Sequence, residues 1–508
     1  MADDPQWSDA PPVSFGRRIT QLAEAHPDAV AIHFAPLDGD VRAVTWKELD
    51  QASNRAARAL IAAGATSSSR VVIGLPNGIE HVVAALGAWK VGACAVPLRW
   101  DLPEWERDRV LAVARPDVIV AEWPNITTAP QLRRESLADD STSAAPLPDV
   151  VATPARAIAS SGSTGTPKII QSNRPGEAVP GQSLHNPTAV FMGQHAGQVV
   201  LVPAPLYHTN GFLMLHSALF EGQTAVLMQK FEATLAVDLI ERHRVNTFVG
   251  VTIILQRIAR LPDIDQRDLS SLDSVLHGGA PLPQWVARKW IDLIGPERFY
   301  VCYGSSEQAG TTMTRGDVWL THPETVGLPF NSELKILDAD LQELPPGEIG
   351  DIYMRWIGQD APSFDYQGGT PQTLPDLFSS VGDMGWVDEE GFLYLADRRN
   401  DLIISGGANV YAAEVEKALS DHPGVVDVVV VGVPDDDWGQ RVHAFVQPAP
   451  RLPAPTHDEL REHCRTRLVA YKVPKTYELV EQIERSDAGK VRRADYAARA
   501  SERPAELA

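Results

Sequence analysis

Short apolar runs alternate along much of the chain with longer stretches in which apolar residues recur at helical spacing. Residues 71–75 (VVIGL) predict a buried strand, and residues 79–91 predict an apolar helix directly after it. The same order returns further on, with strands expected at 199–203 and 224–228 and helices at 216–220 and 235–243. Such alternation predicts an α/β protein in which helices cover parallel or mixed sheets.

A charged cluster at 397–401 (DRRND) interrupts this pattern and predicts a joint. After it, residues 402–405 (LIIS) and 425–433 (VVDVVVVGV) predict strands, and residues 413–419 predict a helix. The tail therefore predicts a small α+β unit. We expect a large N-terminal domain over residues 1–397, a hinge at 398–401 and a small mobile domain over 402–508.

Composition narrows the class of protein. The chain has 508 residues, 44% of them apolar, which is enough for a large buried core. It has three cysteines without a C-x-x-C pair, and no early apolar stretch follows basic residues, so we expect a protein of the reducing cytosol without a secretory signal. No apolar run is long enough to predict a membrane span. A formal charge of -21 argues against nucleic acid as the main partner.

A glycine-rich run at 160–168 (SSGSTGTPK) is the first candidate for chemistry. Backbone N–H groups and hydroxyls of such a loop can converge on phosphate oxygens, and the lysine adds charge. The run is not the usual ATPase loop, because Pro167 stands where that loop needs glycine and Ile169 where it needs serine or threonine. Taken alone, it is equally compatible with a phosphate site and with a flexible surface loop.

Eight further motifs accompany the run. They are 44–60 (VTWKELDQASNRAARAL), 86–98 (LGAWKVGACAVPL), 205–212 (PLYHTNGF), 278–282 (GGAPL), 303–307 (YGSSE), 381–384 (VGDM), 397–410 (DRRNDLIISGGANV) and 488–493 (AGKVRR). In this order they resemble the acyl-adenylate-forming superfamily, which includes acyl-CoA ligases, luciferases and peptide-synthetase adenylation domains. The resemblance implies a large AMP-binding domain with a five-layered αβαβα core and a β-barrel-like part. It also implies a small C-terminal AMP-binding domain that rotates about the hinge.

The resemblance also implies a nucleotide site. Tyr303 would pack on adenine and Asp383 would accept the ribose hydroxyls, while Arg398 would support the ribose or the hinge. Glu307 and Thr164 would hold Mg²⁺, since a hard cation on phosphate oxygens favours oxygen ligands. Each residue also has an ordinary alternative role. Tyr303 would be a core aromatic, Asp383 a turn carboxylate, Glu307 a surface glutamate and Arg398 a partner in a plain salt bridge. The remaining nucleotide-binding candidates are Ser161, Gly162, Ser163, Gly165, Lys168, Gly279, Ala280, Pro281, Gly304, Ser305 and Ser306.

The implied reaction has two steps, and the tail serves both. First a carboxylate attacks the α-phosphorus of MgATP, giving an acyl-adenylate and pyrophosphate, with Lys490 as the fixed counter-charge. The small domain then turns about Asp401, and a thiol displaces AMP. Gly406 and Gly407 would leave room for the pantetheine arm of coenzyme A. Arg441 and Lys472 are candidates for its phosphates, or else solvated surface charges.

The acyl group is expected to be bulky and hydrophobic. His208, Phe212, Val251, Ile253, Ile254 and Gly304 are the candidate wall of its pocket. Residues 361–368 (APSFDYQG) resemble bacterial ligases of aromatic, steroid, bile-acid or terpenoid carboxylates, which suits degradation or secondary metabolism. A separate carrier protein is an alternative source of the thiol. Homodimers are common in the family.

Two residues depart from the family pattern beside the glycine-rich run. Ile169 stands where glycine is usual, and Asn173 where histidine is usual. A β-branched residue limits backbone angles, so Ile169, together with Asn173, raises the hypothesis of impaired adenylation, in which a separate adenylating enzyme supplies the acyl-adenylate. A non-catalytic acyl-adenylate binder is the remaining alternative. Milder departures are Ala412 in place of proline and Asn400 before the hinge aspartate.

Overall fold

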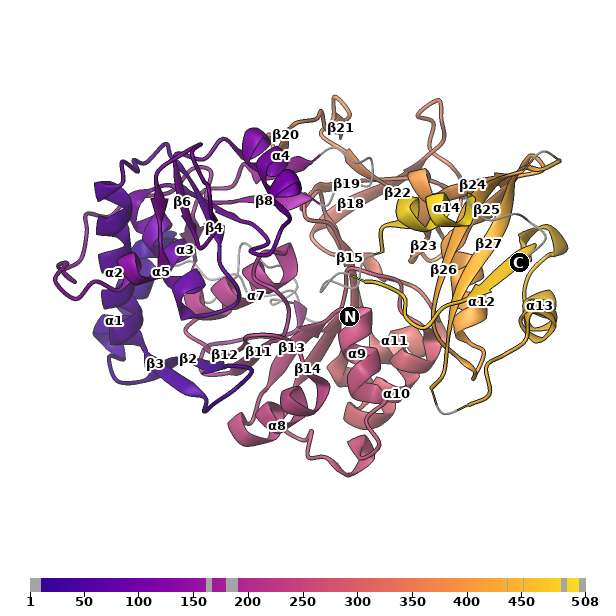
Figure 1. Ribbon diagram of the computed structural model, residues 1–508, viewed down its shortest axis with the longest axis horizontal. Coiled ribbons are helices and arrows are strands. Elements are labelled where there is room, and N and C mark those ends of the chain that lie inside the picture. The colour runs from indigo at the N-terminus through magenta and orange to yellow at the C-terminus, as the bar shows by residue number, and fades with distance from the viewer. Residues whose placement is uncertain are drawn as a thin grey trace.

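The computed structural model describes residues 11–160, 167–179, 191–435, 437–450, 452–485 and 491–501. In Figure 1 a large domain occupies the left and centre, and a small domain, orange to yellow, lies at the right. Among the described residues, none of the helices has both the length and the apolar character needed to cross a membrane.

A nine-stranded sheet forms the centre of the large domain, in the order β17-β16-β15-β14-β13-β11-β12-β2-β3. Strands β15 to β2 in this order are parallel, and β3, β16 and β17 are antiparallel additions at the two edges. The bounds are β2 Val30–Ala35, β3 Arg42–Thr45, β11 Val199–Val202, β12 Thr224–Met228, β13 Thr247–Gly250, β14 Ser274–His277, β15 Phe299–Gly304, β16 Thr311–Arg315 and β17 Leu328–Pro329.

A second, parallel sheet has the order β5-β4-β6-β7, and helices separate it from the first. Helices α1, α2, α3 and α7 share one core with the inner faces of both sheets, whereas α4 covers the outer face of the small sheet and α8, α9 and α10 that of the large one. The five-layered αβαβα core is confirmed. The bounds are β4 Arg70–Gly74, β5 Cys94–Pro97, β6 Val118–Ala121, β7 Gln131–Leu132, α1 Phe15–Ala25, α2 Trp46–Ala62, α3 Ile79–Val91, α4 Glu104–Ala114, α5 Arg134–Leu137, α7 Thr209–Phe220, α8 Ala233–His243, α9 Thr252–Ala259, α10 Gln284–Ile294 and α11 Gly316–Thr321.

Smaller sheets carry the segments between these layers and the small domain. One has the order β20-β9-β8, a second has the order β18-β19-β22-β21 with β23 paired to β22, and β1 pairs with β10. The bounds are β1 Val13–Ser14, β8 Ala157–Ser160, β9 Lys168–Ser172, β10 Glu177–Ala178, β18 Ser332–Leu337, β19 Gly350–Trp356, β20 Phe364–Gln367, β21 Gln372–Thr373, β22 Ser379–Val387 and β23 Leu393–Arg398. Strand β23 runs directly into the expected hinge.

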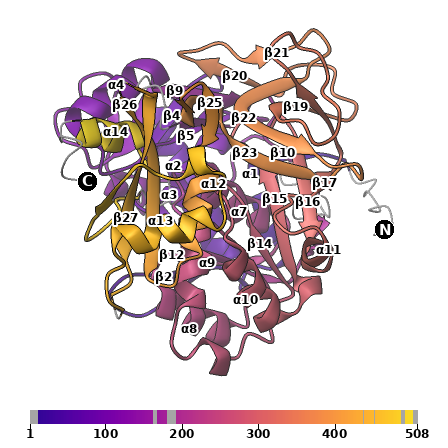
Figure 2. The same ribbon diagram turned by 90° about the vertical axis from the view of Figure 1, so that its right-hand side faces the viewer.

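The small domain is a five-stranded sheet with helices, as Figure 2 shows from its side. Its valine-rich strand β26 pairs with β27 and contributes to two apolar clusters that contain only residues after position 402. The predicted α+β unit is confirmed. The bounds are β24 Leu402–Ser405, β25 Ala408–Tyr411, α12 Ala412–Ser420, β26 Val425–Asp435, β27 Gly439–Pro448, α13 His457–Arg465, β28 Thr476–Leu479 and α14 Arg493–Ser501.

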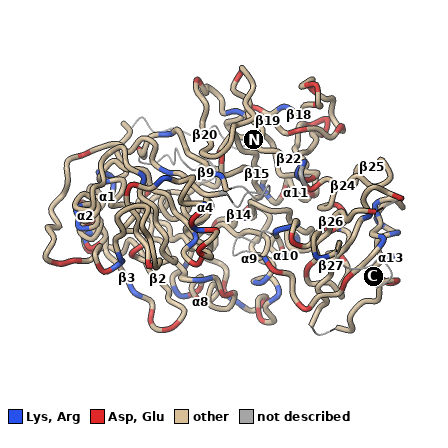
Figure 3. The backbone as a smooth tube through the Cα atoms, turned by 45° about the horizontal axis from the view of Figure 1, so that its top comes forward, with Lys and Arg blue, Asp and Glu red and all other residues tan. Residues whose placement is uncertain are grey.

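Charged residues are distributed over both domains. Figure 3 shows acidic and basic positions interspersed along helices and loops, with no face of one sign in that view. Because the chain as a whole is strongly acidic, an anionic ligand needs local donors.

Candidate active site

Tyr303, Asp383 and Arg398 come together where the large domain leads into the expected hinge. The Tyr303 hydroxyl, at the end of β15, donates a hydrogen bond of 2.9 Å to Oδ2 of Asp383 on β22. Nε of Arg398, opposite on β23, lies 3.2 Å from Oδ1 of the same carboxylate. Burial, and then the negative charge of Asp383, raise the pKa of Tyr303 well above its usual range. The phenol is therefore a hydrogen-bond donor at neutral pH.

Glu307 and Lys168 meet around a third residue, Tyr366. The Tyr366 hydroxyl donates a 2.7 Å hydrogen bond to Oε1 of Glu307, and Nζ of Lys168 lies 5.2 Å from the centre of the tyrosine ring. Tyr366 reaches this position because β20 pairs with β9, which begins at Lys168. Burial and the Glu307 carboxylate raise the pKa of Tyr366. The sequence did not single out Tyr366, and its place in the 361–368 motif was the available signal.

The turn after Glu307 is held in an unusual conformation. Gln308 has φ 51°, a left-handed backbone that residues other than glycine adopt rarely. The indole N–H of Trp356 donates to its carbonyl at 2.6 Å, and the Ser363 hydroxyl donates to the same oxygen at 3.2 Å. The guanidinium of Arg156 contacts its side-chain oxygen. Motif reasoning missed this support of Glu307.

The other nucleotide candidates lie on nearby loops. Gly279 has φ 89°, and Ala280 and Pro281 follow it after β14. The Pro281 carbonyl accepts the Thr252 hydroxyl at 2.7 Å. Ser306 accepts a hydrogen bond of 2.6 Å from the Thr209 hydroxyl, and Gly304 and Ser305 connect it to β15. Ser161, Gly162, Ser163, Thr164 and Gly165 lie outside the described residues, as does Lys490.

Ile169 lies within strand β9 and its side chain points into the core. It is 1% exposed and packs in the apolar cluster between the four-stranded sheet and α4. Its backbone pairs with Ala159 on one side and Gln367 on the other. Asn173, just past the strand, donates its side-chain N–H to the Pro362 carbonyl at 3.0 Å. Both departures from the family pattern therefore have structural contacts of their own.

The hinge and the glycine pair lie on the small-domain side. Asp401 ends a short 3-10 turn, Arg399–Asp401, and its carboxylate lies 3.3 Å from Nε of Arg493. Gly406 and Gly407 have φ 59° and 80°. A Cβ on Gly406 would lie 2.7 Å from the Trp438 ring, whereas a Cβ on Gly407 would meet nothing within 4 Å. Backbone angles, rather than crowding, therefore call for glycine at position 407.

Charged and aromatic side chains surround the glycine pair. Trp438 is 42% exposed, and Nζ of Lys475 lies 4.4 Å from the centre of its ring. The predicted coenzyme residues are engaged in ion pairs, Arg441 with Asp435 at 3.7 Å and Lys472 with Glu414 at 2.6 Å. Trp438 was not singled out from the sequence, where an aromatic residue in a loop carries no distinctive signal.

The candidate acyl wall is distributed over two cores. Phe212 is 1% exposed and packs in the central layer against the tilted ring of His216, with ring centres 4.4 Å apart. Val251 and Ile254 pack in the outer layer, where Ile253 lies at its edge. His208 precedes α7, and Gly304 is exposed at the end of β15.

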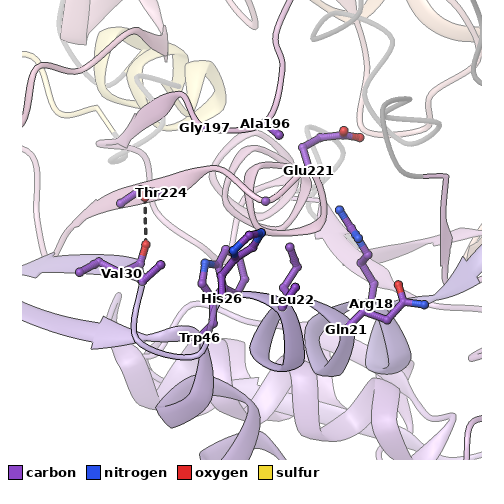
Figure 4. Close-up of a pocket in the computed structure, with 13 residues that line it drawn as sticks. Arg18, Gln21, Leu22, His26, Val30, Trp46, Ala196, Gly197, Glu221 and Thr224 are labelled. Carbon is purple, nitrogen blue, oxygen red and sulfur yellow. Dashed lines mark hydrogen bonds between the residues drawn. The ribbon is translucent and has the colours of Figure 1, made fainter.

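A hollow in the surface of the large domain lies elsewhere. It has a volume of about 410 Å³ and lies around α1, at the end of the large domain away from the small one (Figures 1 and 4). None of the predicted site residues lines it. A second hollow, about 10 Å³, lies beside Tyr303, Gly304 and Ser305. Among the described residues, polar contacts define the candidate site.

Comparison with known proteins identifies the class. Residues 19–358 match the family described as AMP-binding enzyme, and residues 414–490 match its C-terminal domain. The two parts of the fold thus define a two-domain AMP-binding enzyme. Similarity to individual proteins extends over nearly the whole chain. Fatty acid–[acyl-carrier-protein] ligase ScoC of Streptomyces coeruleorubidus is 30% identical over 89% of this chain and 91% of its own.

Other relatives are similar over the same extent. Feruloyl-CoA synthase of an Amycolatopsis species is 31% identical over 88% of this chain and 92% of its own. The structure of o-succinylbenzoate CoA synthetase from Bacillus subtilis, in complex with the acyl-adenylate intermediate OSB-AMP, has a TM-score of 0.81, 26% identity, and coverage of 94% and 97%. The chain belongs to the AMP-binding enzyme family, in its acid–CoA ligase branch.

The chain is an AMP-forming acid–thiol ligase, which uses ATP with Mg²⁺ and coenzyme A. The described residues suit these groups. Glu307 supplies a carboxylate oxygen, the ligand type that Mg²⁺ prefers, next to the cation Lys168. Within the described ranges, no cluster of three or more His, Cys, Asp or Glu side chains is placed to bind a metal ion.

Proposed function

We propose that the chain converts a bulky hydrophobic carboxylic acid through an acyl-adenylate to its CoA thioester by domain alternation. The observation that carries this proposal is the contact of Tyr303 and Arg398 with one carboxylate, Asp383. Arg398 lies three residues before Asp401, so the proposed ribose site adjoins the proposed hinge. The proposed division is a large domain over 1–397, a hinge at 398–401 and a mobile domain over 402–508.

In the first step, the residues of this chain would bind and orient ATP. Tyr303 packs against the base, with Gly279, Ala280 and Pro281 as the opposite wall, and Asp383 accepts the ribose hydroxyls. Lys168 and the glycine-rich run bind the outer phosphates, and Glu307 with Thr164 holds Mg²⁺, which neutralises charge on them when bound. Lys490 stabilises the charge that develops as the carboxylate attacks.

In the second step, rotation about Asp401 would bring the glycine pair to the site. The open space at Gly407 supports passage of a thin pantetheine arm. The exposed ring of Trp438, with Lys475 over it, offers an aromatic face and a cation for the nucleotide end of coenzyme A. Arg441 and Lys472 would exchange their present carboxylate partners for phosphate.

The acid is proposed from the relatives and from the apolar wall. Relatives named feruloyl-CoA synthase and 2-succinylbenzoate–CoA ligase support an aromatic or polycyclic acid for this chain as well. A carrier-protein thiol is the second candidate, because the 30% identical relative is named a fatty acid–[acyl-carrier-protein] ligase. Three unpaired cysteines suit the cytosol as its location.

Two alternatives keep the fold but change the chemistry. Impaired adenylation, with an acyl-adenylate supplied by a separate enzyme, was suggested by Ile169. Its position in a strand, with a buried side chain, removes the argument that its bulk fills the phosphate loop. A non-catalytic binder is disfavoured because Lys168 and Glu307 are kept and lie around one tyrosine.

One set of assays separates these functions. Acid with ATP and CoA is compared with synthetic acyl-adenylate and CoA, over a panel of aromatic, polycyclic and fatty acids, and with phosphopantetheinylated carrier protein in place of CoA. Comparable thioester yields from both starting points would support the complete ligase, and product from the adenylate alone would support impaired adenylation. No thioester from either would refute the proposal.

Lys490→Ala tests the assignment of the two steps. Adenylate formation should be lost while thioester formation from synthetic adenylate persists. Lys289→Ala is the control, because Lys289 on α10 pairs with Asp265 at the surface of the large domain and is none of the proposed site residues. Equal loss of both steps in Lys490→Ala would show that the lysine is assigned to the wrong step.

A further inference from the structure

Two consecutive arginines of the tail contact different domains. Arg493 faces its own domain, where it contacts the Glu416 carboxylate, the Val430 carbonyl at 3.0 Å and the hinge residue Asp401 at 3.3 Å. Arg492 faces the large domain, where its Nη2 lies 2.6 Å from Oε1 of Glu106 on α4. The basic pair therefore spans the boundary between the two domains.

Helix α4 borders the paired strands β9 and β20, which carry Lys168 and Tyr366. A Cβ added to Gly368, just past β20, would lie 3.2 Å from Val113 near the end of α4 and 3.1 Å from the Pro167 carbonyl. The side of α4 that faces inward shares a core with Ile169 on β9. Glu106 thus stands on a helix that packs directly beside the proposed phosphate side of the site.

We infer that Glu106 and Arg492 are positioning residues for adenylate formation. Their ion pair holds the tail of the small domain against α4 in the arrangement seen here. Lys490 is two residues before Arg492 in the chain, so a contact that fixes Arg492 restricts how far the lysine can lie from α4. The inference rests on the proposed function of Lys490 in the first step.

The strength of the pair suits a contact that must break in every cycle. Arg492 is 57% exposed and Glu106 20%, so solvent and salt screen their attraction. Two further contacts between the domains are also solvent-accessible: Lys417 pairs with Glu324, and Arg260 donates to the Val426 carbonyl at 3.4 Å. Rotation about Asp401 would separate Arg492 from Glu106 but leave Arg493 on its own domain.

Half-reaction kinetics test the inference. Glu106→Gln and Arg492→Gln should slow adenylate formation from acid and ATP about fivefold, which corresponds to about 1 kcal/mol for an ion pair of this exposure. Thioester formation from synthetic adenylate and CoA should be unchanged or faster. The charge exchange Glu106→Arg with Arg492→Glu should recover most of the lost rate. Raising the ionic strength should slow adenylate formation in the wild type and hardly affect Glu106→Gln.

Arg493→Gln is the matched control. Its contacts with Glu416 and Asp401 lie within the small domain and hinge, so it should lower the melting temperature and slow both half-reactions. The inference is overturned if Glu106→Gln slows both steps equally, or leaves both unchanged, or if the charge exchange recovers nothing.

Cross-linking supplies a readout that needs no turnover. Cysteines at positions 106 and 492, in a Cys302→Ser background, should be joined by a short bismaleimide, since Cys94 and Cys464 are buried. The joined protein should form adenylate but no thioester. Absence of cross-linking would overturn the inference whatever the activity. If the protein before joining makes no thioester from any starting point, cross-linking would support the contact and refute the proposed function.

Discussion

Asp383→Asn tests whether this carboxylate accepts the ribose hydroxyls. In the structure its two oxygens accept from the Tyr303 hydroxyl and lie beside the Arg398 guanidinium. Each carboxylate oxygen has two acceptor positions, so both could still take a ribose hydroxyl. Asparagine keeps one acceptor oxygen, replaces the other with a donor, and removes the charge. One charged hydrogen bond to ATP is therefore lost.

The expected magnitude follows from the number and kind of bonds lost. A hydrogen bond to a charged group contributes about 1.5–3 kcal/mol, which corresponds to roughly 10- to 150-fold weaker binding of ATP. The ion pair with Arg398 adds little, because that guanidinium is 52% exposed. The free energy of unfolding should change by less than the binding free energy, since Tyr303 keeps an acceptor in asparagine.

The assay compares ATP with 2′-deoxyATP in the adenylate-forming step. The wild type should prefer ATP by about tenfold or more, and Asp383→Asn should lose most of this preference, because the charge and one of the two acceptor oxygens that bind the ribose hydroxyls are gone. Tyr303→Phe is the control, since it removes the hydroxyl and keeps the carboxylate, so its preference for ATP should persist. An undiminished preference in Asp383→Asn would refute the ribose assignment.

Three further predictions concern neighbouring groups. Tyr366→Phe removes the hydrogen bond to Glu307, so adenylate formation should fall by roughly tenfold and need more Mg²⁺, while thioester formation from adenylate stays intact; an unchanged Mg²⁺ titration would contradict this. Ile169→Gly introduces the residue that is usual in the family, and it should lower the free energy of unfolding by roughly 2–5 kcal/mol without faster adenylation. The control Ile169→Val should lower it by about 0.5–1.5 kcal/mol. Faster adenylation in the glycine variant would restore the impaired-adenylation hypothesis. Burial lowers the pKa of His81 to about 3 and that of His216 to about 4, so only the unfolded chain gains their protons as the pH falls. The free energy of unfolding should then fall by up to about 1.4 kcal/mol per pH unit for each histidine, from near pH 6.5 down to the pKa of that histidine in the folded protein. In denaturant titrations at pH 5, His81→Leu should lose less unfolding free energy than the wild type. An equal loss in both proteins would contradict the lowered pKa of His81.

The sequence predicted most reliably those elements whose burial is uniform. Helix α3 has the predicted bounds, Ile79–Val91, because it is packed on nearly all sides and its residues are almost all apolar. Helix α7 begins at Thr209, earlier than the predicted 216, because its first turn carries polar residues near the candidate site. A hydrophobic pattern predicts the buried part of a helix but does not predict where its exposed first turn begins.

Contacts made by strand pairing were beyond motif reasoning. Tyr303 and Asp383 meet as the motifs implied, although 80 residues separate them. Tyr366 reaches Glu307 because β20 pairs with β9, and the Trp356 indole reaches the Gln308 carbonyl because β19 belongs to the adjoining sheet. Neither pairing has a local signal, since a tyrosine or tryptophan in a strand is ordinary.

The isoleucine after the glycine-rich run shows how structure changes the meaning of a departure. From the sequence alone, Ile169 is adjacent to a phosphate loop, where a β-branched side chain would restrict the backbone. In the structure the strand has already begun at Lys168, so Ile169 adopts the extended backbone that β-branched residues favour. Its side chain fills the core beneath α4, the helix that also carries Glu106. A glycine there would leave a cavity under that helix, so Ile169 supports the surface that Arg492 of the tail contacts.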